Sequence, residues 1–239
     1  MTAGVRIDGL TAGYRGRIAL REITATIPAG AVTAVLGHNG SGKSTLLAAL
    51  AGLLRPIAGR IDRGGHTRTA FVVQHSAVSA TLPITVGQTV AMGRWAHLGH
   101  WRRSRRQDTT VVADCLRRMD LTGLAHRRLD TLSGGQRQRT LIAQALAQQA
   151  DLLLLDEPTA NLDARSRRVI AGLLTETAAT GVTVVHATHR SDEARAADHH
   201  LVLDDGRLLP HALPGEQPSG HDELSFDRNA TAAQSLGLP

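Results

Sequence analysis

The segment GHNGSGKS, residues 37–44, restricts the possible folds of this chain more than any other segment. It fits the pattern G-x-x-x-x-G-K-[ST] and lies between the β-type run AVTAVL and the helix-type run KSTLLAALAGL. Glycines let backbone N–H groups converge on phosphate oxygens, and the start of a helix adds the positive end of its dipole. The order of strand, loop and helix therefore predicts a phosphate site. The residues expected around the phosphates are Gly37, His38, Asn39, Gly40, Ser41, Gly42, Lys43, Ser44 and Thr45.

Lysine occurs only once in this chain. Lysine and arginine together number 27, and Lys43 is the only lysine among them. Arginine is a planar fork, whereas lysine is a compact point charge, so a site that needs the second does not accept the first. We therefore predict that Lys43 contacts the β- and γ-phosphates of a nucleotide, and that the Ser44 hydroxyl binds Mg²⁺.

A second segment, DLLLLDEP at residues 151–158, is largely apolar and then acidic. This pattern is typical of a central strand of a parallel sheet, buried on both faces. Its last carboxylates fall at the carboxyl end of the strand, where open α/β sheets bind ligands. We predict that Asp156 lies beside Ser44 and holds Mg²⁺, and that Glu157 orients and deprotonates the water that attacks the γ-phosphate.

The rest of the chain alternates between strand-type and helix-type runs. Short β-type runs fill residues 5–36, and further strands are expected in GRIDR, TAFVVQ and VTVVHAT, with a hairpin in LVLDDGRLL. Helical runs are expected near 85–119 and 163–179. This alternation predicts an α/β fold, a parallel sheet with helices on both faces. We expect one domain over 1–209 with a helical subdomain, about 78–135, inserted in it, and a flexible tail at 210–239, which is rich in Pro, Gly and Ser.

Composition narrows the choice of function. The single cysteine excludes an internal disulfide, and no apolar stretch approaches the ~18 residues of a membrane-spanning helix. The formal net charge of +6 leaves nucleic acid or an anionic membrane surface open as partners. An arginine-rich stretch fits three interpretations: a solvated helix face, attraction to an anionic membrane leaflet, or contact with nucleic acid. Its residues are Arg102, Arg103, Arg105 and Arg106, with Trp95 and Trp101 nearby.

A third motif, Leu132-Ser133-Gly134-Gly135-Gln136, lies between the phosphate loop and the LLLLDEP strand. With three such motifs in this order, the chain resembles the ATP-binding cassette family over about residues 3–209. The resemblance implies a P-loop NTPase core with an N-terminal antiparallel β subdomain and an inserted α-helical subdomain. It also implies ATP and Mg²⁺ as cofactors and the hydrolysis of ATP as the activity.

The resemblance assigns roles to further residues. Tyr14 matches the aromatic residue that stacks on adenine, and it is the only tyrosine of the chain. Gln74 matches the glutamine that contacts Mg²⁺ and the transport partner, and His189 matches the histidine that contacts the γ-phosphate. The loop through which two subunits of this family communicate corresponds to Asn161, Leu162 and Asp163.

The resemblance also implies a pair of chains. In this family the motif at 132–136 binds the γ-phosphate of an ATP held by a second subunit, so a homodimer closes on two nucleotides. The other implied partners are integral membrane permease subunits and, indirectly, an extracytoplasmic substrate-binding protein, with the chain on the cytoplasmic side of the plasma membrane. No nucleic acid is expected. The chain departs from the family at Ala160, where serine is frequent, and at Arg190, where an acidic residue is frequent; neither change removes a catalytic group.

The cargo is indicated only by the segment LPITVGQTVAMGRWAHLG, residues 82–99. It resembles the corresponding segment of bacterial importers for zinc, manganese, iron chelates and cobalamin, and the zinc and manganese branch looks closest. We therefore expect import of a metal ion such as zinc or manganese, with siderophore or cobalamin import as the alternative and export after it. A nucleic-acid-associated ATPase of this family is less expected, because this chain lacks the long coiled coils or cysteine clusters of that type.

Overall fold

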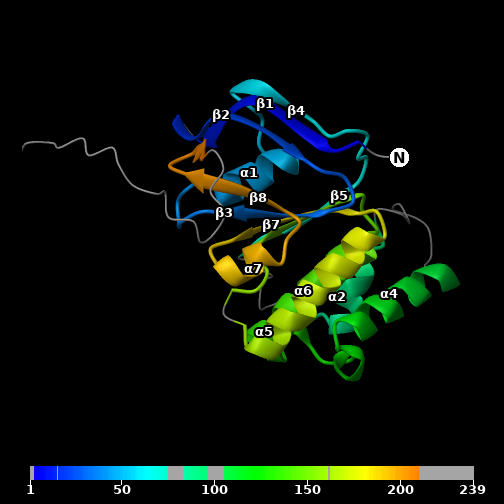
Figure 1. The fold of residues 1–239 in the computed structure, drawn as a ribbon. Helices are drawn as coiled ribbons and strands as arrows, with labels where there is room; N and C mark the ends of the chain where they lie inside the picture. The colour runs from blue at the N-terminus through cyan, green and yellow to red at the C-terminus, as the bar shows by residue number, and fades with distance from the viewer. Residues whose placement is uncertain (1–2, 15, 75–82, 96–104, 161, 210–239) are drawn as a thin grey trace, which may run out of the picture.

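The computed structural model describes residues 3–14, 16–74, 83–95, 105–160 and 162–209. An antiparallel sheet stands at the N-terminal side of the molecule (Figure 1), with the strand order β2-β1-β4. Its strands are β1 (Val5–Tyr14), β2 (Arg17–Ile27) and β4 (Ala58–Asp62). The sheet matches the antiparallel β subdomain that the sequence predicts.

A larger sheet forms the centre of the molecule, in the order β5-β6-β7-β3-β8-β9. All neighbouring strands in it are parallel except β9, which pairs antiparallel with β8. Every residue of β3, β6 and β7 is buried, which explains why the sequence of these strands is nearly continuously apolar. The strands are β3 (Val32–Leu36), β5 (Thr69–Val72), β6 (Leu152–Asp156), β7 (Thr183–Thr188), β8 (His199–Asp204) and β9 (Arg207–Leu208).

Helix α1 (Lys43–Leu50) packs between the two sheets (Figure 1). All of its residues except Ser44 are buried, so it is apolar on every side, as expected for a helix inside a core. Successive leucines of β6 point to opposite faces of the central sheet: Leu152 and Leu154 pack in the core around α1, and Leu153 and Leu155 pack in the core on the other face. The predicted α/β fold is thus confirmed.

The second face of the central sheet is covered by helices (Figure 1). The helical pattern expected near 85–119 contains α2, which ends at Met92, and α4, which begins at Arg106; residues 96–104 lie outside the described part. The helices are α2 (Val86–Met92), α4 (Arg106–Arg118), α5 (Gly134–Ala147), α6 (Ala164–Ala179) and α7 (Ser191–Arg195), with short 3₁₀ turns η1 (Thr122–Leu124) and η2 (Leu129–Thr131). The limits 78–135 of the inserted subdomain stay a prediction.

The run VAMGR, at the end of α2, joins three helices. A Cβ on Gly93 would lie 2.2 Å from the Gln144 carbonyl oxygen, so α2 and α5 approach each other as only glycine permits. The buried Arg94 guanidinium donates from Nε to Asp108 at the start of α4 (2.9 Å) and from Nη1 to the Ala147 carbonyl at the end of α5 (2.8 Å). The run therefore fixes α2, α4 and α5 relative to one another.

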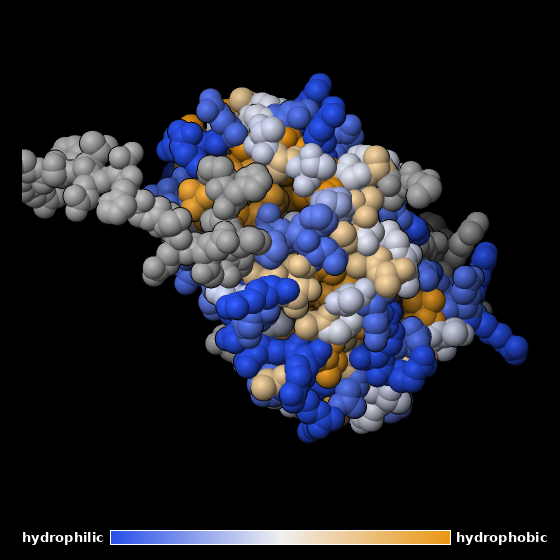
Figure 2. Space-filling view, viewed as in Figure 1, coloured by the Kyte–Doolittle hydropathy of each residue, from blue (hydrophilic) through white to orange (hydrophobic). Residues whose placement is uncertain are grey.

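The surface of this helical half carries many hydrophilic residues, mainly around α5 and at the outer end of α4, with apolar residues exposed between them (Figure 2). Arg105 and Arg106 are exposed, as is Trp95, at 62%. The other members of the arginine-rich stretch, Trp101, Arg102 and Arg103, lie outside the described residues, as does the predicted tail 210–239. Within the described part of the chain, no helix combines the length and apolar character that a membrane span requires.

Candidate nucleotide site and catalytic centre

The predicted phosphate loop connects β3 to α1 as expected. Gly37, Gly40 and Gly42 have positive φ angles of 153°, 90° and 108°, a conformation that side chains with a Cβ rarely adopt. Gly42 is also the N-cap residue of α1, and a Cβ there would lie 2.8 Å from the Leu20 side chain on β2. The loop is therefore curved around the start of α1, with the antiparallel sheet packed directly behind it.

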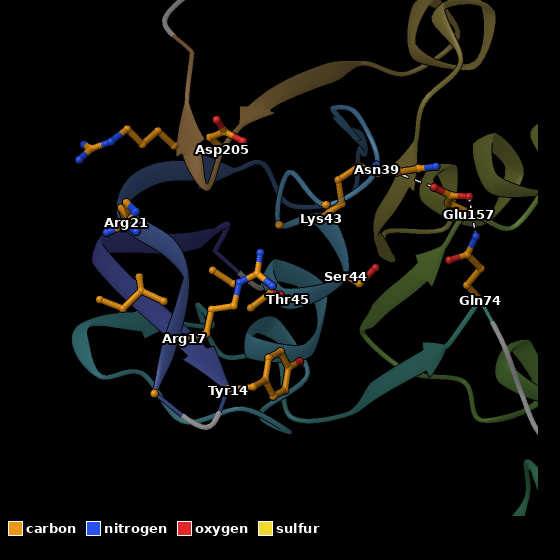
Figure 3. A pocket seen from close by; sticks show the side chains of 16 residues that line it. Tyr14, Arg17, Arg21, Asn39, Lys43, Ser44, Thr45, Gln74, Glu157 and Asp205 are labelled. Atoms are coloured by element: carbon orange, nitrogen blue, oxygen red, sulfur yellow. Dashed lines mark hydrogen bonds and ion pairs between the residues drawn. The ribbon is translucent and has the colours of Figure 1, made fainter.

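A cavity of about 1270 Å³ opens in front of this loop (Figure 3). Tyr14 and Arg17 lie at one end, Gln74 and Glu157 lie at the other, and Lys43 and Ser44 lie between them. Its volume exceeds that of typical small-molecule pockets, roughly 300–1,000 Å³, and is sufficient for a nucleoside triphosphate. The residues that line it are Tyr14, Gly16, Arg17, Ile18, Ala19, Arg21, Asn39, Gly40, Gly42, Lys43, Ser44, Thr45, Gln74, Glu157, Asp205 and Arg207.

The Lys43 ammonium is buried at the base of the cavity, with 5% of the residue exposed. It donates to the carbonyl oxygens of Gly37 (2.8 Å) and His38 (3.0 Å), and it lies 3.8 Å from Glu157 Oε1. The single lysine of the chain is therefore held by the loop itself and faces the acidic end of the central strand.

Glu157 is the point on which the predicted catalytic residues converge. Gln74 Nε2 donates to Glu157 Oε2 (2.7 Å), and His189 Nδ1 lies 3.5 Å from Oε1, the oxygen that also faces Lys43. Its φ of 47° places this residue in the left-handed region, which is uncommon for a residue other than glycine and is often found at functional sites. Residues from four separate segments thus meet at one carboxylate, whose side chain is only 10% exposed.

Asp156 directly precedes Glu157 and is buried at the end of β6. It does not line the cavity, whereas Ser44 does. The predicted neighbourhood of Asp156 and Ser44 therefore stays a prediction. A Ser hydroxyl, an Asp carboxylate and a Gln amide oxygen are nonetheless the hard oxygen donors that Mg²⁺ prefers, so this set of residues fits the ion.

The motif at 132–136 lies at the start of α5 and does not line the cavity. Ser133 is the N-cap: its Oγ accepts from the Gln136 backbone N–H (3.3 Å), and the Gln136 side chain accepts from the Ser133 N–H (3.1 Å). Leu132 is buried, while Gly134 is exposed. In a single chain, this motif and the phosphate loop are therefore parts of separate surfaces.

Two of the three residues of the loop to which the resemblance assigns communication between subunits lie in the described part of the chain. Asn161 lies outside the described residues. Leu162 is buried and lies 3.3 Å from the position that a Cβ on Gly135 would take. Asp163 caps α6 by accepting from the backbone N–H of Ser166 (2.8 Å), and this hydrogen bond is the main cause that lowers the pKa of the Asp163 carboxyl. The loop after β6 thus touches the start of α5.

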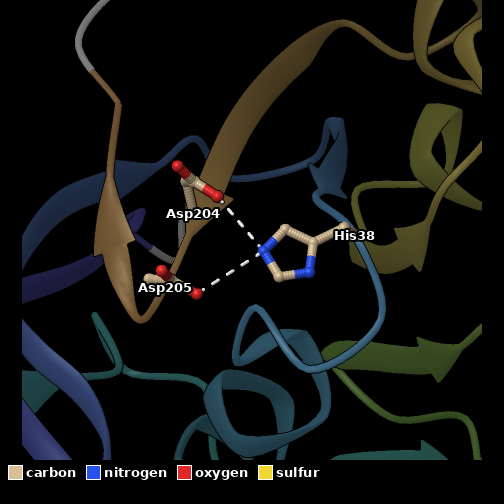
Figure 4. A group of neighbouring side chains, drawn as sticks. All are labelled: His38, Asp204 and Asp205. Atoms are coloured by element: carbon tan, nitrogen blue, oxygen red, sulfur yellow. Dashed lines mark hydrogen bonds and ion pairs between the residues drawn. The ribbon is translucent and has the colours of Figure 1, made fainter. Parts of the chain in front are cut away.

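His38 connects the phosphate loop to the turn between β8 and β9 (Figure 4). Its Nδ1 lies 2.8 Å from the Asn39 carbonyl oxygen, and its Nε2 lies 3.1 Å from Asp204 Oδ1 and 3.7 Å from Asp205 Oδ1. The backbone adds a further bond, from the Gly206 N–H to the Ser41 carbonyl oxygen (3.0 Å). This turn therefore forms one side of the cavity entrance.

Sequence reasoning missed the polar residues on that side. Arg17 and Arg21 on β2 line the cavity, together with Asp205 and Arg207 from the β8–β9 hairpin. Arg21 and the hairpin are joined through the backbone, because the Arg21 N–H donates to the Gly206 carbonyl oxygen (2.7 Å). These residues carry no motif, and only the packing of two distant segments brings them to the cavity.

A glycine-rich loop between a parallel strand and a helix, facing acidic residues at the carboxyl end of another strand of the same sheet, defines a P-loop nucleotide hydrolase. The family model described as "ABC transporter" matches residues 20–160, which is more than half of the chain. The chain belongs to the ABC transporter family, as an ATPase domain of the kind that drives transport.

Individual relatives agree with this assignment. The chain is 35% identical to the manganese transport system ATP-binding protein MntB of Listeria monocytogenes, over 93% of this chain and 95% of the relative. It is 37% identical to the ferric enterobactin transport ATP-binding protein FepC of Escherichia coli, over 90% of this chain and 83% of the relative.

Two solved structures have the same fold. One is an ABC transporter described as of the metal-chelate type, in an inward-facing conformation, with a TM-score of 0.78, 34% identity and coverage of 86% of this chain and 82% of that one. The other is a dimeric ABC cassette with ADP and phosphate bound after hydrolysis, with a TM-score of 0.73, 26% identity and coverage of 85% and 96%.

Proposed function

We propose that this chain binds ATP in the cavity in front of the phosphate loop and hydrolyses it with Glu157 as the general base. The observation that carries the proposal is the convergence of Lys43, Gln74 and His189 on the Glu157 carboxylate, at distances of 3.8, 2.7 and 3.5 Å. A base of this kind needs both a fixed orientation and a neighbouring positive charge where the γ-phosphate will lie. Glu157 has both.

The two ends of the cavity suit the two ends of the nucleotide. Tyr14 is 52% exposed at the end remote from Glu157, so its ring is available to stack on adenine. The N–H groups of residues 39–45 and the Lys43 ammonium suit the phosphates. Ser44, Gln74 and Asp156 would hold Mg²⁺, which, when bound, neutralises phosphate charge. His189 would contact the γ-phosphate from the other side of Glu157.

In this proposal the Glu157 carboxylate accepts a proton from the attacking water. Its Oε2 is already a hydrogen-bond acceptor of the Gln74 amide, so Oε1 is the oxygen better placed to receive the proton. Oε1 faces both Lys43 and His189, so the water would be held between the base and the two cationic or proton-donating groups that face the phosphate.

We further infer that two copies of the chain close on two ATP molecules. The motif Leu132, Ser133, Gly134, Gly135 and Gln136 lies away from the cavity of its own chain, so it is available to the γ-phosphate in the cavity of a second copy. The start of α5 suits that task, because the first N–H groups of a helix lack partners within it and carry the positive end of the dipole. Leu162, Asp163 and Asn161 would pass information between the two sites.

We propose that ATP hydrolysis by this chain powers the import of a metal ion such as zinc or manganese. The support is the resemblance of residues 82–99 and the name of the manganese transport relative. The FepC relative keeps siderophore import as the alternative. Permease subunits would bind the chain at the cytoplasmic face of the membrane, and an extracytoplasmic substrate-binding protein would act indirectly, so the cargo would not touch this chain.

The decisive experiment uses Glu157→Gln with Glu176→Gln as its matched control. Glu176 is an exposed residue of α6, so the same chemical change there removes no group of the site. We expect Glu157→Gln to bind ATP and to form a stable dimer, with hydrolysis roughly 100- to 10,000-fold slower, since this is the usual contribution of a general base. Lys43→Ala should instead weaken ATP binding itself. Wild-type hydrolysis by Glu157→Gln would refute the assignment of the base.

The cargo requires a cellular test. We would delete the gene, restrict metals in the medium, and measure cellular zinc, manganese and iron by mass spectrometry. Copies of wild type and of Glu157→Gln would be returned to the deletion strain. A deficit of one metal that only the active copy restores would identify the ion. Unchanged metal contents would reject zinc and manganese import and direct the search to chelates or to export.

A further inference from the structure

Glu193, on the short helix α7, joins two loops of the catalytic centre. Its Oε1 accepts from the Thr159 hydroxyl at 2.5 Å, and its Oε2 accepts from the Thr188 hydroxyl at 2.7 Å. The carboxylate is only 11% exposed, and both threonines are buried. Hydrogen bonds to a buried charged group are stronger than neutral ones, so this bridge is a firm link between residues far apart in the chain.

The two threonines stand next to the two residues proposed to act on the nucleotide. Thr159 follows Glu157 by two positions, in the turn after β6. Thr188 ends β7 and directly precedes His189. Glu157 Oε1 and His189 Nδ1 lie 3.5 Å apart, and the Glu193 carboxylate links the two segments that carry them through Thr159 and Thr188.

Arg190, at a position where an acidic residue is frequent in the family, completes the arrangement. Its Nε lies 3.4 Å from Glu193 Oε1, so it balances the charge of the partly buried carboxylate. Its backbone N–H donates to the Thr188 hydroxyl oxygen (3.1 Å), and its guanidinium forms two hydrogen bonds with Asp192 (2.8 and 3.1 Å). Both sequence neighbours of His189, Thr188 and Arg190, therefore contact Glu193, while the His189 side chain is half exposed.

We propose that Glu193 is a positioning residue for ATP hydrolysis, which fixes the loop of Glu157 and the loop of His189 at their catalytic separation. This inference rests on the proposed function of those two residues. Glu193 does not line the nucleotide cavity, and neither do Thr159 and Thr188. Removal of the carboxylate should therefore change the chemical step and leave nucleotide binding unchanged.

The test is the steady-state hydrolysis of ATP by the full chain carrying Glu193→Ala, with Glu176→Ala as the control for loss of an exposed glutamate. We expect kcat to fall roughly tenfold to 100-fold, the range produced by a misplacement of up to about 1 Å, with KM and the Kd for ATP within about twofold of wild type. Glu193→Gln keeps one acceptor oxygen and should recover part of kcat. A wild-type kcat in Glu193→Ala would overturn the inference.

A second experiment distinguishes a positioning role from a merely structural one by measuring Glu193→Ala in a variant that already lacks His189. If Glu193 acts by fixing the separation of His189 from Glu157, then that separation no longer matters once His189 is absent, and adding Glu193→Ala to His189→Ala should lower the residual kcat by far less than it lowers that of the wild type. An equal fold-loss in both backgrounds would overturn the inference. Thr188→Val and Thr159→Val keep side-chain volume and each remove one bond, so each should lower kcat by less than Glu193→Ala does; these variants also serve if Glu193→Ala is poorly folded.

Failure of this inference and failure of the proposed function have different signatures. Glu157→Gln is measured beside the Glu193 variants. If Glu157→Gln hydrolyses ATP at the wild-type rate, the proposed base is wrong, and the positioning role is wrong with it. If Glu157→Gln is inactive and Glu193→Ala is fully active, only the positioning role is refuted.

Discussion

His186 should make the folding of this protein sensitive to mild acid. It lies in the middle of β7, between Ala34 of β3 and Leu155 of β6, and is 4% exposed. Among the described residues its Nδ1 has no hydrogen-bond partner. Burial lowers the pKa of this imidazole from 6.5 to about 4, and the nearby Glu193 carboxylate opposes that shift only in part. The folded protein therefore keeps His186 neutral at pH 5.

In the unfolded chain, His186 does not stay neutral at pH 5. It binds a proton as the pH falls below 6.5, while the folded protein binds none until the pH approaches 4, so protonation favours the unfolded chain in this range. These two pKa values imply that His186 removes about 2 kcal/mol from the free energy of unfolding between pH 7 and pH 5. The effect is fully absent well above pH 6.5.

Urea unfolding at pH 7 and pH 5 tests this value. His186→Asn removes the titrating group. When the pH falls from 7 to 5, the free energy of unfolding of this variant should therefore decrease by about 2 kcal/mol less than that of the wild type. Other histidines titrate equally in both proteins and cancel in the comparison. His199→Asn, at an exposed position of β8, is the control and should follow the wild-type pH dependence. Parallel pH profiles for His186→Asn and wild type would refute the reasoning.

Three further outcomes are expected. Burial raises the pKa of the Cys115 thiol to about 11, so a thiol reagent at pH 8 should label the native protein slowly and the urea-unfolded chain at once; rapid native labelling would contradict the burial. Gly93→Ala should destabilise the fold by roughly 1–3 kcal/mol in urea titrations, because its Cβ would overlap the Gln144 carbonyl. Gly172→Ala, a helical position with open space, should be neutral or stabilising. Ser133→Arg should bind ATP normally by calorimetry and fail to dimerise, because Ser133 is proposed to face the ATP of a second copy. ATP-dependent dimers of this variant would argue against a site shared by two chains.

Short sequence motifs predicted the centre of this fold, because its backbone conformation and its burial restrict which residues can occupy those positions. The loop at 37–44 needs glycines at left-handed positions, and the strand at 152–156 needs side chains that tolerate burial on both faces. Both needs are visible in a single stretch of sequence. The close approach of Gly93 to α5 was not predicted, because it depends on a contact with Gln144, which is distant in the sequence.

Long-range contacts account for the parts of the site that the sequence did not reveal. Arg21 reaches the cavity through a bond to the β8–β9 turn, more than 180 residues later in the chain. Glu193 meets Thr159 across 34 residues, and neither residue belongs to a motif. Partners of this kind follow from the order of the parallel strands, which places the ends of β6 and β7 side by side.

The motif at 132–136 shows how the structure of a single chain can indicate contact with a second chain. Ser133 and Gln136 cap α5 by themselves, so the fold is satisfied without a nucleotide at this end. Gly134 is different: no heavy atom of the described chain lies within 4 Å of the position that its Cβ would take. An alanine would fit there, so the packing of this chain does not explain the glycine. Close approach of a group from outside the chain would explain it, and the phosphate of an ATP bound by a second copy is the group that the start of a helix suits best.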